Sequence, residues 1–90
     1  MSVTVRIPSP LRPLTGGAGT VDCQPGTVGA IIDELDAAHP GFKDRITEAG
    51  ALRRFVNVFV AGQDVRFEQG IDTPVTDGQE VTILPAVAGG

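Results

Sequence analysis

The sequence "DGQEVTILPAVAGG", residues 77–90, carries most of the information about the fold. After a turn signal, residues 80–83 alternate polar and apolar side chains, which is typical of a half-buried β-strand, and we expect that strand to span residues 80–84. Pro85 cannot donate a ladder hydrogen bond, so we expect sheet pairing to end there. The sequence therefore predicts a folded domain, residues 1–84, followed by an extended and flexible tail, residues 85–90.

The strand that ends the domain needs partners, and the upstream sequence offers four candidates. The first two should form a hairpin around a long connection rich in proline and glycine. The run "FVNVFV" is dense in β-branched and aromatic residues, so we expect a central strand, and "DVRF" a short edge strand. A loop should fill residues 70–78. The candidate strands are residues 3–7, 20–21, 55–60 and 64–67.

One strong helical pattern lies between Pro25-Gly26 and His39. Thr27 is the expected N-cap, and Pro40-Gly41 should stop the helix. Residues 42–46 can add one further turn. A single main helix covers only one face of a sheet, so the other face should stay open. The apolar residues spaced by three and four are Val28, Ile31, Ile32, Leu35 and Ala38.

Composition excludes several classes of function. A chain of 90 residues builds one small domain, without a second lobe to enclose a deep cleft. Seven basic and 11 acidic side chains give a net charge of -4, which argues against nucleic acid as a partner. Cys23 and His39 are the single residues of their types, too few for a zinc site. Without a signal peptide or a membrane-length apolar run, we expect a soluble cytoplasmic protein and no membrane partner.

The element order and the ending together resemble a known family. "FVNVFVAG", "DVRF" and "DGQEVTILPAVAGG" are similar to the ubiquitin-like sulfur carriers, which include the small subunit of molybdopterin synthase and the thiamine-pathway carrier. The resemblance spans essentially the whole chain. It is strongest to the branch associated with cysteine biosynthesis, through the "RP-T-GG" loop at residues 12–17 and "ILPAVAGG". It implies an α+β fold of the β-grasp type, with a mixed sheet of four to five strands.

The tail has physical properties that suit such a carrier. Its six residues can reach roughly 20 Å, and its small side chains suit insertion into a narrow channel. A carboxylate is a poor acyl donor, and this chain has no group that could activate it, so a partner must do so. The residues that we expect to thread the partner's channel are Ala86, Val87, Ala88, Gly89 and Gly90.

The resemblance implies what happens at the end of the tail. An ATP-dependent enzyme of the ubiquitin-activating type, using Mg-ATP, would adenylate Gly90 and exchange the adenylate for sulfur. The resulting thiocarboxylate would donate sulfur to a synthase for cysteine, a thiosugar or a cofactor. A metalloprotease that releases product from the tail is a further implied partner. The chain itself would be a carrier and not an enzyme, with no cofactor or metal of its own.

Two other functions fit the same tail. A ubiquitin-like modifier would be joined through Gly90 to lysines of target proteins, because that chemistry also begins with adenylation. A small subunit could instead keep its tail permanently in an enzyme's active site while still delivering sulfur. Conjugates in a cell lysate would indicate the modifier, and stable co-purification with a larger subunit would indicate the third alternative.

A candidate partner surface follows from strand alternation. If the helix covers the valines of "VNVFV", Phe59 points to the open face, as does Leu84 on the last strand. The two could form an apolar patch near the start of the tail, or could pack ordinarily under a loop.

The other conspicuous residues have structural interpretations. We assign Cys23 to packing, His39 to the end of the helix and Gly16-Gly17 to turn geometry. Arg53-Arg54 is typical of a solvated pair, although it could meet an acidic partner surface.

Overall fold

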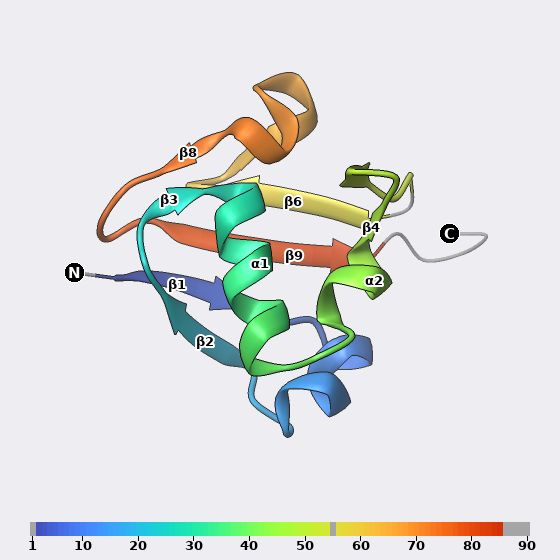
Figure 1. Cartoon of the computed structure of the whole chain (residues 1–90). Helices are drawn as coiled ribbons and strands as arrows, with labels where there is room; N and C mark the ends of the chain where they lie inside the picture. Colours follow the sequence, from blue (N-terminus) through green and yellow to red (C-terminus); the bar gives the residue numbers. More distant parts are fainter. Residues whose placement is uncertain (1, 55, 86–90) are drawn as a thin grey trace.

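The computed structural model describes residues 2–54 and 56–85 and arranges them as a sheet with helices on one side (Figure 1). In chain order the elements are β1 (Val3–Arg6), the 3₁₀ helix η1 (Ser9–Thr15), β2 (Thr20–Cys23), β3 (Gly26–Thr27), α1 (Val28–Ala38), α2 (Phe42–Ile46), β4 (Thr47–Glu48), β5 (Ala51–Leu52), β6 (Val56–Val60), β7 (Gln63–Asp64), the 3₁₀ helices η2 (Val65–Phe67) and η3 (Gly70–Asp72), β8 (Pro74–Val75) and β9 (Glu80–Pro85).

The main sheet has five strands in the order β2-β1-β9-β6-β7. The last strand, β9, is therefore the middle one. It runs parallel to β1 and antiparallel to β6, while β1–β2 and β6–β7 are antiparallel. The predicted mixed sheet of four to five strands is confirmed. Two short pairs, β3–β8 and β4–β5, lie outside this sheet.

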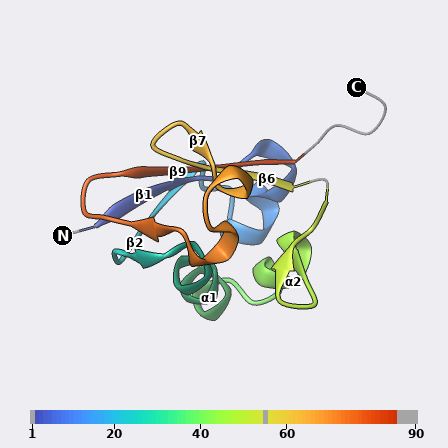
Figure 2. The same ribbon diagram turned by 90° about the horizontal axis from the view of Figure 1, so that it is seen from above.

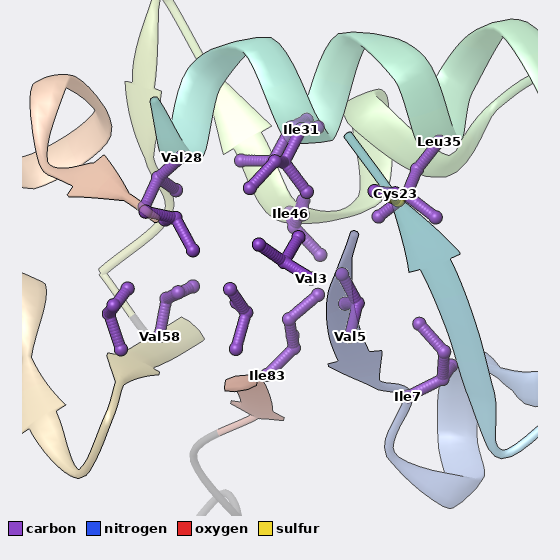
Figure 3. Packing of buried hydrophobic residues seen from close by; sticks show 14 of the residues in the cluster. Val3, Val5, Ile7, Cys23, Val28, Ile31, Leu35, Ile46, Val58 and Ile83 are labelled. Atoms are coloured by element: carbon purple, nitrogen blue, oxygen red, sulfur yellow. The ribbon is translucent and has the colours of Figure 1, made fainter. Parts of the chain in front are cut away.

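The hydrophobic core lies between the sheet and α1. Viewed along the sheet, both α-helices lie on the same side of it (Figure 2). Side chains from α1, including Val28, Ile31 and Leu35, point toward Val58 and Ile83 of the sheet (Figure 3). Phe42 and Ile46 of α2 are fully buried as well. Burying a large aliphatic side chain contributes about 1.5–3 kcal/mol, so this layer supplies most of the stability.

The ends of α1 follow from its sequence. The Ala30 backbone N–H donates a 3.1 Å hydrogen bond to Thr27 Oγ1, which confirms the predicted N-cap. At the other end, the His39 N–H donates to the Leu35 carbonyl at 2.7 Å. Gly41 then adopts a φ of 96°, a left-handed conformation that favours glycine, and α2 begins.

Three sequence predictions were wrong in part. "DVRF" is not an edge strand, because only Asp64 pairs with β6 and residues 65–67 turn as η2, capped by the Asp64 carboxylate. The loop over residues 70–78 contains η3 and β8, which pairs with β3. β6 is an interior strand as expected, but β9 holds the middle position.

Two further details concern the connection after β1 and the lengths of the helices. The long connection in the first hairpin is largely η1, and Gly16 and Gly17 follow it with φ values of 67° and 90°, so their role is turn geometry as expected. In the part of the chain that the structure describes, no helix has both the length and the apolar character to cross a bilayer.

Candidate partner interface at the start of the tail

The open face is the side of the sheet away from α1, formed here by Asn57, Phe59, Thr82 and Leu84. Along β6, buried residues 56, 58 and 60 alternate with the half-buried Asn57 and Phe59. Along β9, Val81 and Ile83 are buried, Thr82 is half-buried and Leu84 is 45% exposed. This alternation confirms the predicted inside and outside positions on both strands.

The register of β6 and β9 places the two predicted patch residues close together. Asn57 pairs with Leu84, and Phe59 pairs with Thr82, so Phe59 and Leu84 are diagonal neighbours on adjacent strands. Such neighbours are about 7–8 Å apart, within reach of large side chains. The structure thus gives both residues the placement that a shared patch needs, and their role in partner binding stays a prediction.

β9 ends at Pro85, at one end of this face. We call the pairs Val56–Pro85 and Asn57–Leu84 the tail root, because they are the last pairs of β9. The tail residues 86–90 are outside the described part of the chain, so the roles predicted for Ala86, Val87, Ala88, Gly89 and Gly90 stay predictions.

An arginine that the sequence reading overlooked lies beside the tail root. Arg66 of η2 donates from Nη2 to the backbone carbonyls of Arg53 and Arg54, at 2.6 Å and 3.0 Å. Its Nη1 donates to Asn57 Oδ1 at 2.5 Å. The interpretation of "DVRF" as a regular edge strand gave no reason to expect one side chain to serve three acceptors. Only the spacing of Arg66 after the turn at residues 61–62 could have placed it near β6.

Cys23 has the environment of a packing residue. Its side chain is 2% exposed in the core. Burial, together with the negative charges of Glu34 and Asp22, raises the pKa of Cys23 to about 11. The thiolate is the nucleophilic form of cysteine, and it is scarce near neutral pH at such a pKa. The thiol is therefore poorly suited to handling sulfur, as expected from the sequence.

Of the two arginines before β6, Arg53 has structural contacts through its side chain. Arg53 donates from Nε and Nη2 to the Asp44 carbonyl, at 3.1 Å and 2.9 Å, and its Nη1 lies 3.4 Å from a Glu48 carboxylate oxygen. These contacts tie the segment before β6 to α2 and β4. The possibility that Arg53-Arg54 meets an acidic partner stays untested.

Acidic and histidine side chains do not gather into a metal site in the described ranges, where no group of three or more potential ligands is close enough to hold an ion.

Lys43 and Asp33 form an ion pair on the surface. The hydrogen bond and the charge of Asp33 raise the pKa of Lys43. This pair joins α1 to α2 on the side away from the open face.

The five-stranded sheet around one main helix, with the tail leaving the middle strand, is a ubiquitin-like β-grasp domain. The chain belongs to the ThiS family, which it matches over residues 5–90. It is 50% identical over 93 residues to the sulfur carrier protein CysO of Mycobacterium tuberculosis, with 100% of each chain covered. It is 34% identical over 91 residues to a putative sulfur carrier protein of Archaeoglobus fulgidus, again with complete coverage.

A solved structure extends the comparison to three dimensions. The crystal structure of the BexX/CysO complex of Amycolatopsis orientalis contains a chain with a TM-score of 0.94 and 49% identity to this one. The match covers 98% of this chain and 99% of that one. The expected fold and family are both confirmed.

Proposed function

We propose that this protein is a sulfur carrier that bears sulfur on the carboxyl group of Gly90. The observation that carries the proposal is the 50% identity to a protein named as a sulfur carrier, over the full length of both chains. The fold supports it, because β9 directs the chain out of the sheet at the tail root. Catalysis is left to partners.

The proposed chemistry has two steps. A carboxylate oxygen of Gly90 attacks the α-phosphorus of ATP in the activating enzyme, pyrophosphate leaves, and an acyl-adenylate forms. Sulfide then attacks the carbonyl carbon, AMP leaves, and Gly90 carries a thiocarboxylate. The ATP and Mg²⁺ belong to the partner, whose metal would stabilise the charge that develops on the phosphates.

The proposed partners are the activating enzyme, a sulfur-accepting synthase and a metalloprotease that releases product from the tail. The open face is the docking surface that we assign to the first of these, with Phe59 and Leu84 as apolar contacts. Exposed apolar residues near a reactive end can add binding energy that positions that end. The complex of CysO with BexX supports the view that carriers of this fold bind other proteins.

Mass spectrometry of the intact protein tests this function. Incubation with the activating enzyme, Mg-ATP and sulfide should raise the mass by the difference between one sulfur and one oxygen atom, and fragmentation should place the change at Gly90. Cys23→Ser should acquire the same mass, because the thiol takes no part. An unchanged mass with a demonstrably active cognate enzyme would reject the proposal.

Protein modification is the alternative function. It is favoured by the 38% identity over 64 residues to small archaeal modifier protein 3 of Haloferax volcanii, which covers 71% of this chain and 70% of that one. An antibody to this protein would then detect a ladder of larger conjugates in whole-cell lysates. A single free species carrying a thiocarboxylate supports the carrier.

A further inference from the structure

The outer edge of β6 is only partly covered by a strand. β7 pairs with Phe59 and Val60 alone, so within the described residues the first half of β6 has no strand on that side. η2 continues the chain past β7, and the guanidinium group of Arg66 donates to the carbonyls of Arg53 and Arg54. These carbonyls belong to the turn that leads into β6, where the Arg53 carbonyl also accepts from the Val56 N–H at 3.0 Å, so one side chain ties this turn to η2.

Both the backbone and the side chain of Arg66 are held by hydrogen bonds. Its backbone N–H donates to Asp64 Oδ1 at 2.9 Å, and Asp64 pairs with Phe59 in the β6–β7 ladder. Its guanidinium reaches Asn57, on the open face of the same strand. The β6–β7 pairing, the hydrogen bond of the Arg66 N–H to Asp64 and the hydrogen bond of the guanidinium to Asn57 together form a closed ring of contacts with β6.

This ring includes one residue of the tail root. Asn57, which accepts from Arg66, is the register partner of Leu84, and Val56 is the partner of Pro85. The first half of β6 is thus paired with β9 through its ladder and tied to η2 through the Asn57 side chain. Any loosening of this half of β6 is passed to the last two residues of β9, from which the tail starts.

We propose that Arg66 is a positioning residue for the reactive tail, holding the tail root so that the tail starts from a fixed place on the domain. This inference rests on the proposed function, because positioning matters only if the tail reacts. Arg66 is exposed, so its ionic contribution to stability is small. Its effect on reaction geometry can be larger, since a misplacement of about 1 Å at a reacting centre can cost about a hundredfold in rate.

The planar fork of arginine is the essential property. Two different nitrogen atoms serve three acceptors that lie on the backbone before β6 and on a side chain within it. A lysine ammonium carries the same charge but is a compact point with no fork. Arg66→Lys therefore removes the geometry while it keeps the charge.

Steady-state activation kinetics of Arg66→Lys test the proposal. The matched control is Arg45→Lys, the same change on α2, on the helix side of the sheet. At a temperature where both variants are fully folded, we expect Arg66→Lys to lower kcat for adenylation by about tenfold with an unchanged KM for the carrier. A parental kcat would overturn the proposal, and so would a raised KM with a parental kcat, which would mean direct contact with the partner.

Amide hydrogen exchange gives a measurement that needs no partner. Arg66→Lys should accelerate exchange at Asn57 and Leu84 while leaving Val60 and Val81 at parental rates, whereas Arg45→Lys should change none of these. An unchanged amide exchange rate at Leu84 would contradict the proposal that Arg66 holds the tail root. If the parent protein itself is never adenylated, the proposed function fails, and the exchange experiment still decides whether Arg66 orders the tail root.

Discussion

The two faces of the sheet are built by neighbouring residues of the same strands and have opposite properties. Ile83 is 2% exposed beneath α1, while the next residue, Leu84, is 45% exposed on the open face. The covered face is constrained by packing, because each side chain there must fit its neighbours. The open face is free of that constraint and available for contacts with other molecules. We therefore expect substitutions on the covered face to lower stability, and substitutions on the open face to weaken binding.

The largest loss of stability should follow from truncation on the covered face. Ile83→Ala removes buried methyl and methylene groups below α1 and leaves a cavity, which should lower the free energy of unfolding by about 2–5 kcal/mol. Urea denaturation with two-state fitting measures the loss. A decrease below about 0.5 kcal/mol would contradict the assignment of this face to the core.

A smaller effect should appear at alkaline pH through Cys23, also on the covered face. Its pKa of about 11 lies above the ordinary value of 9.0, so the unfolded thiol loses its proton first as the pH rises. Stability is then fully present below about pH 9 and is lost as the pH rises toward 11. From about pH 8 to pH 10 the loss should be roughly 1 kcal/mol.

The control for this prediction is Cys23→Ala, measured by urea denaturation across the same pH range. The substitution changes stability at every pH, but it should remove the part of the alkaline slope that belongs to the thiol. Parallel slopes for parent and variant would show that Cys23 is not desolvated in the folded protein.

Charge on the open face should affect binding far more than stability. Leu84→Asp should change the free energy of unfolding by no more than about 1 kcal/mol, because nearly half of the Leu84 surface is already exposed to water. In a complex the new carboxylate would be desolvated, so affinity for the activating enzyme should fall at least tenfold. Calorimetric titration and thermal unfolding measure the two quantities.

Ala37→Asp is the matched control, since it adds the same charge at an exposed position of α1. Its affinity for the activating enzyme should equal that of the parent. Equal losses for the two variants would mean that net charge, and not the open face, governs binding. Unfolding of isolated Leu84→Asp would contradict the exposure of this position.

The smallest change in stability should come from the tail. Gly89→Val, or deletion of Gly90, should alter the free energy of unfolding by less than about 0.5 kcal/mol, as for terminal residues in general. Activation should be lost in both cases. The deletion withdraws the carboxylate by roughly 3.5 Å. Valine at position 89 adds a branched Cβ at the point where the partner's channel is expected to admit only backbone. ATP-pyrophosphate exchange at the parental rate would show that the glycine ending is incidental.

Local patterns were sufficient to predict most of the sheet and the main helix. The spacing of Val28, Ile31 and Leu35 predicted α1, and the alternation of residues 56–60 and 80–84 predicted which side chains are buried. These patterns are local because helix and strand periods are set by backbone geometry alone. The family resemblance supplied the fold, and it is the source of the chemistry that we propose for the tail.

The missed features depend on particular side-chain and backbone contacts, local or distant, that composition and periodicity do not encode. "DVRF" has the composition of a strand, but Asp64 caps a 3₁₀ turn with its own carboxylate, and this local bond competes with strand pairing. The β3–β8 pair joins residues almost fifty positions apart and has only two residues on each side. The three acceptors of Arg66 lie on residues 53, 54 and 57, and no sequence period brings them to residue 66.

The central position of β9 determines how the domain responds when its tail is pulled. A force applied through Pro85 enters the middle strand, which is bonded to β1 on one side and to β6 on the other. Traction along β9 loads both ladders in shear, so their hydrogen bonds share the strain and do not open one at a time. A tail continuing from an edge strand would load one ladder only. The middle position of β9 should therefore let the domain resist the traction that the proposed insertion of the tail into a partner would apply.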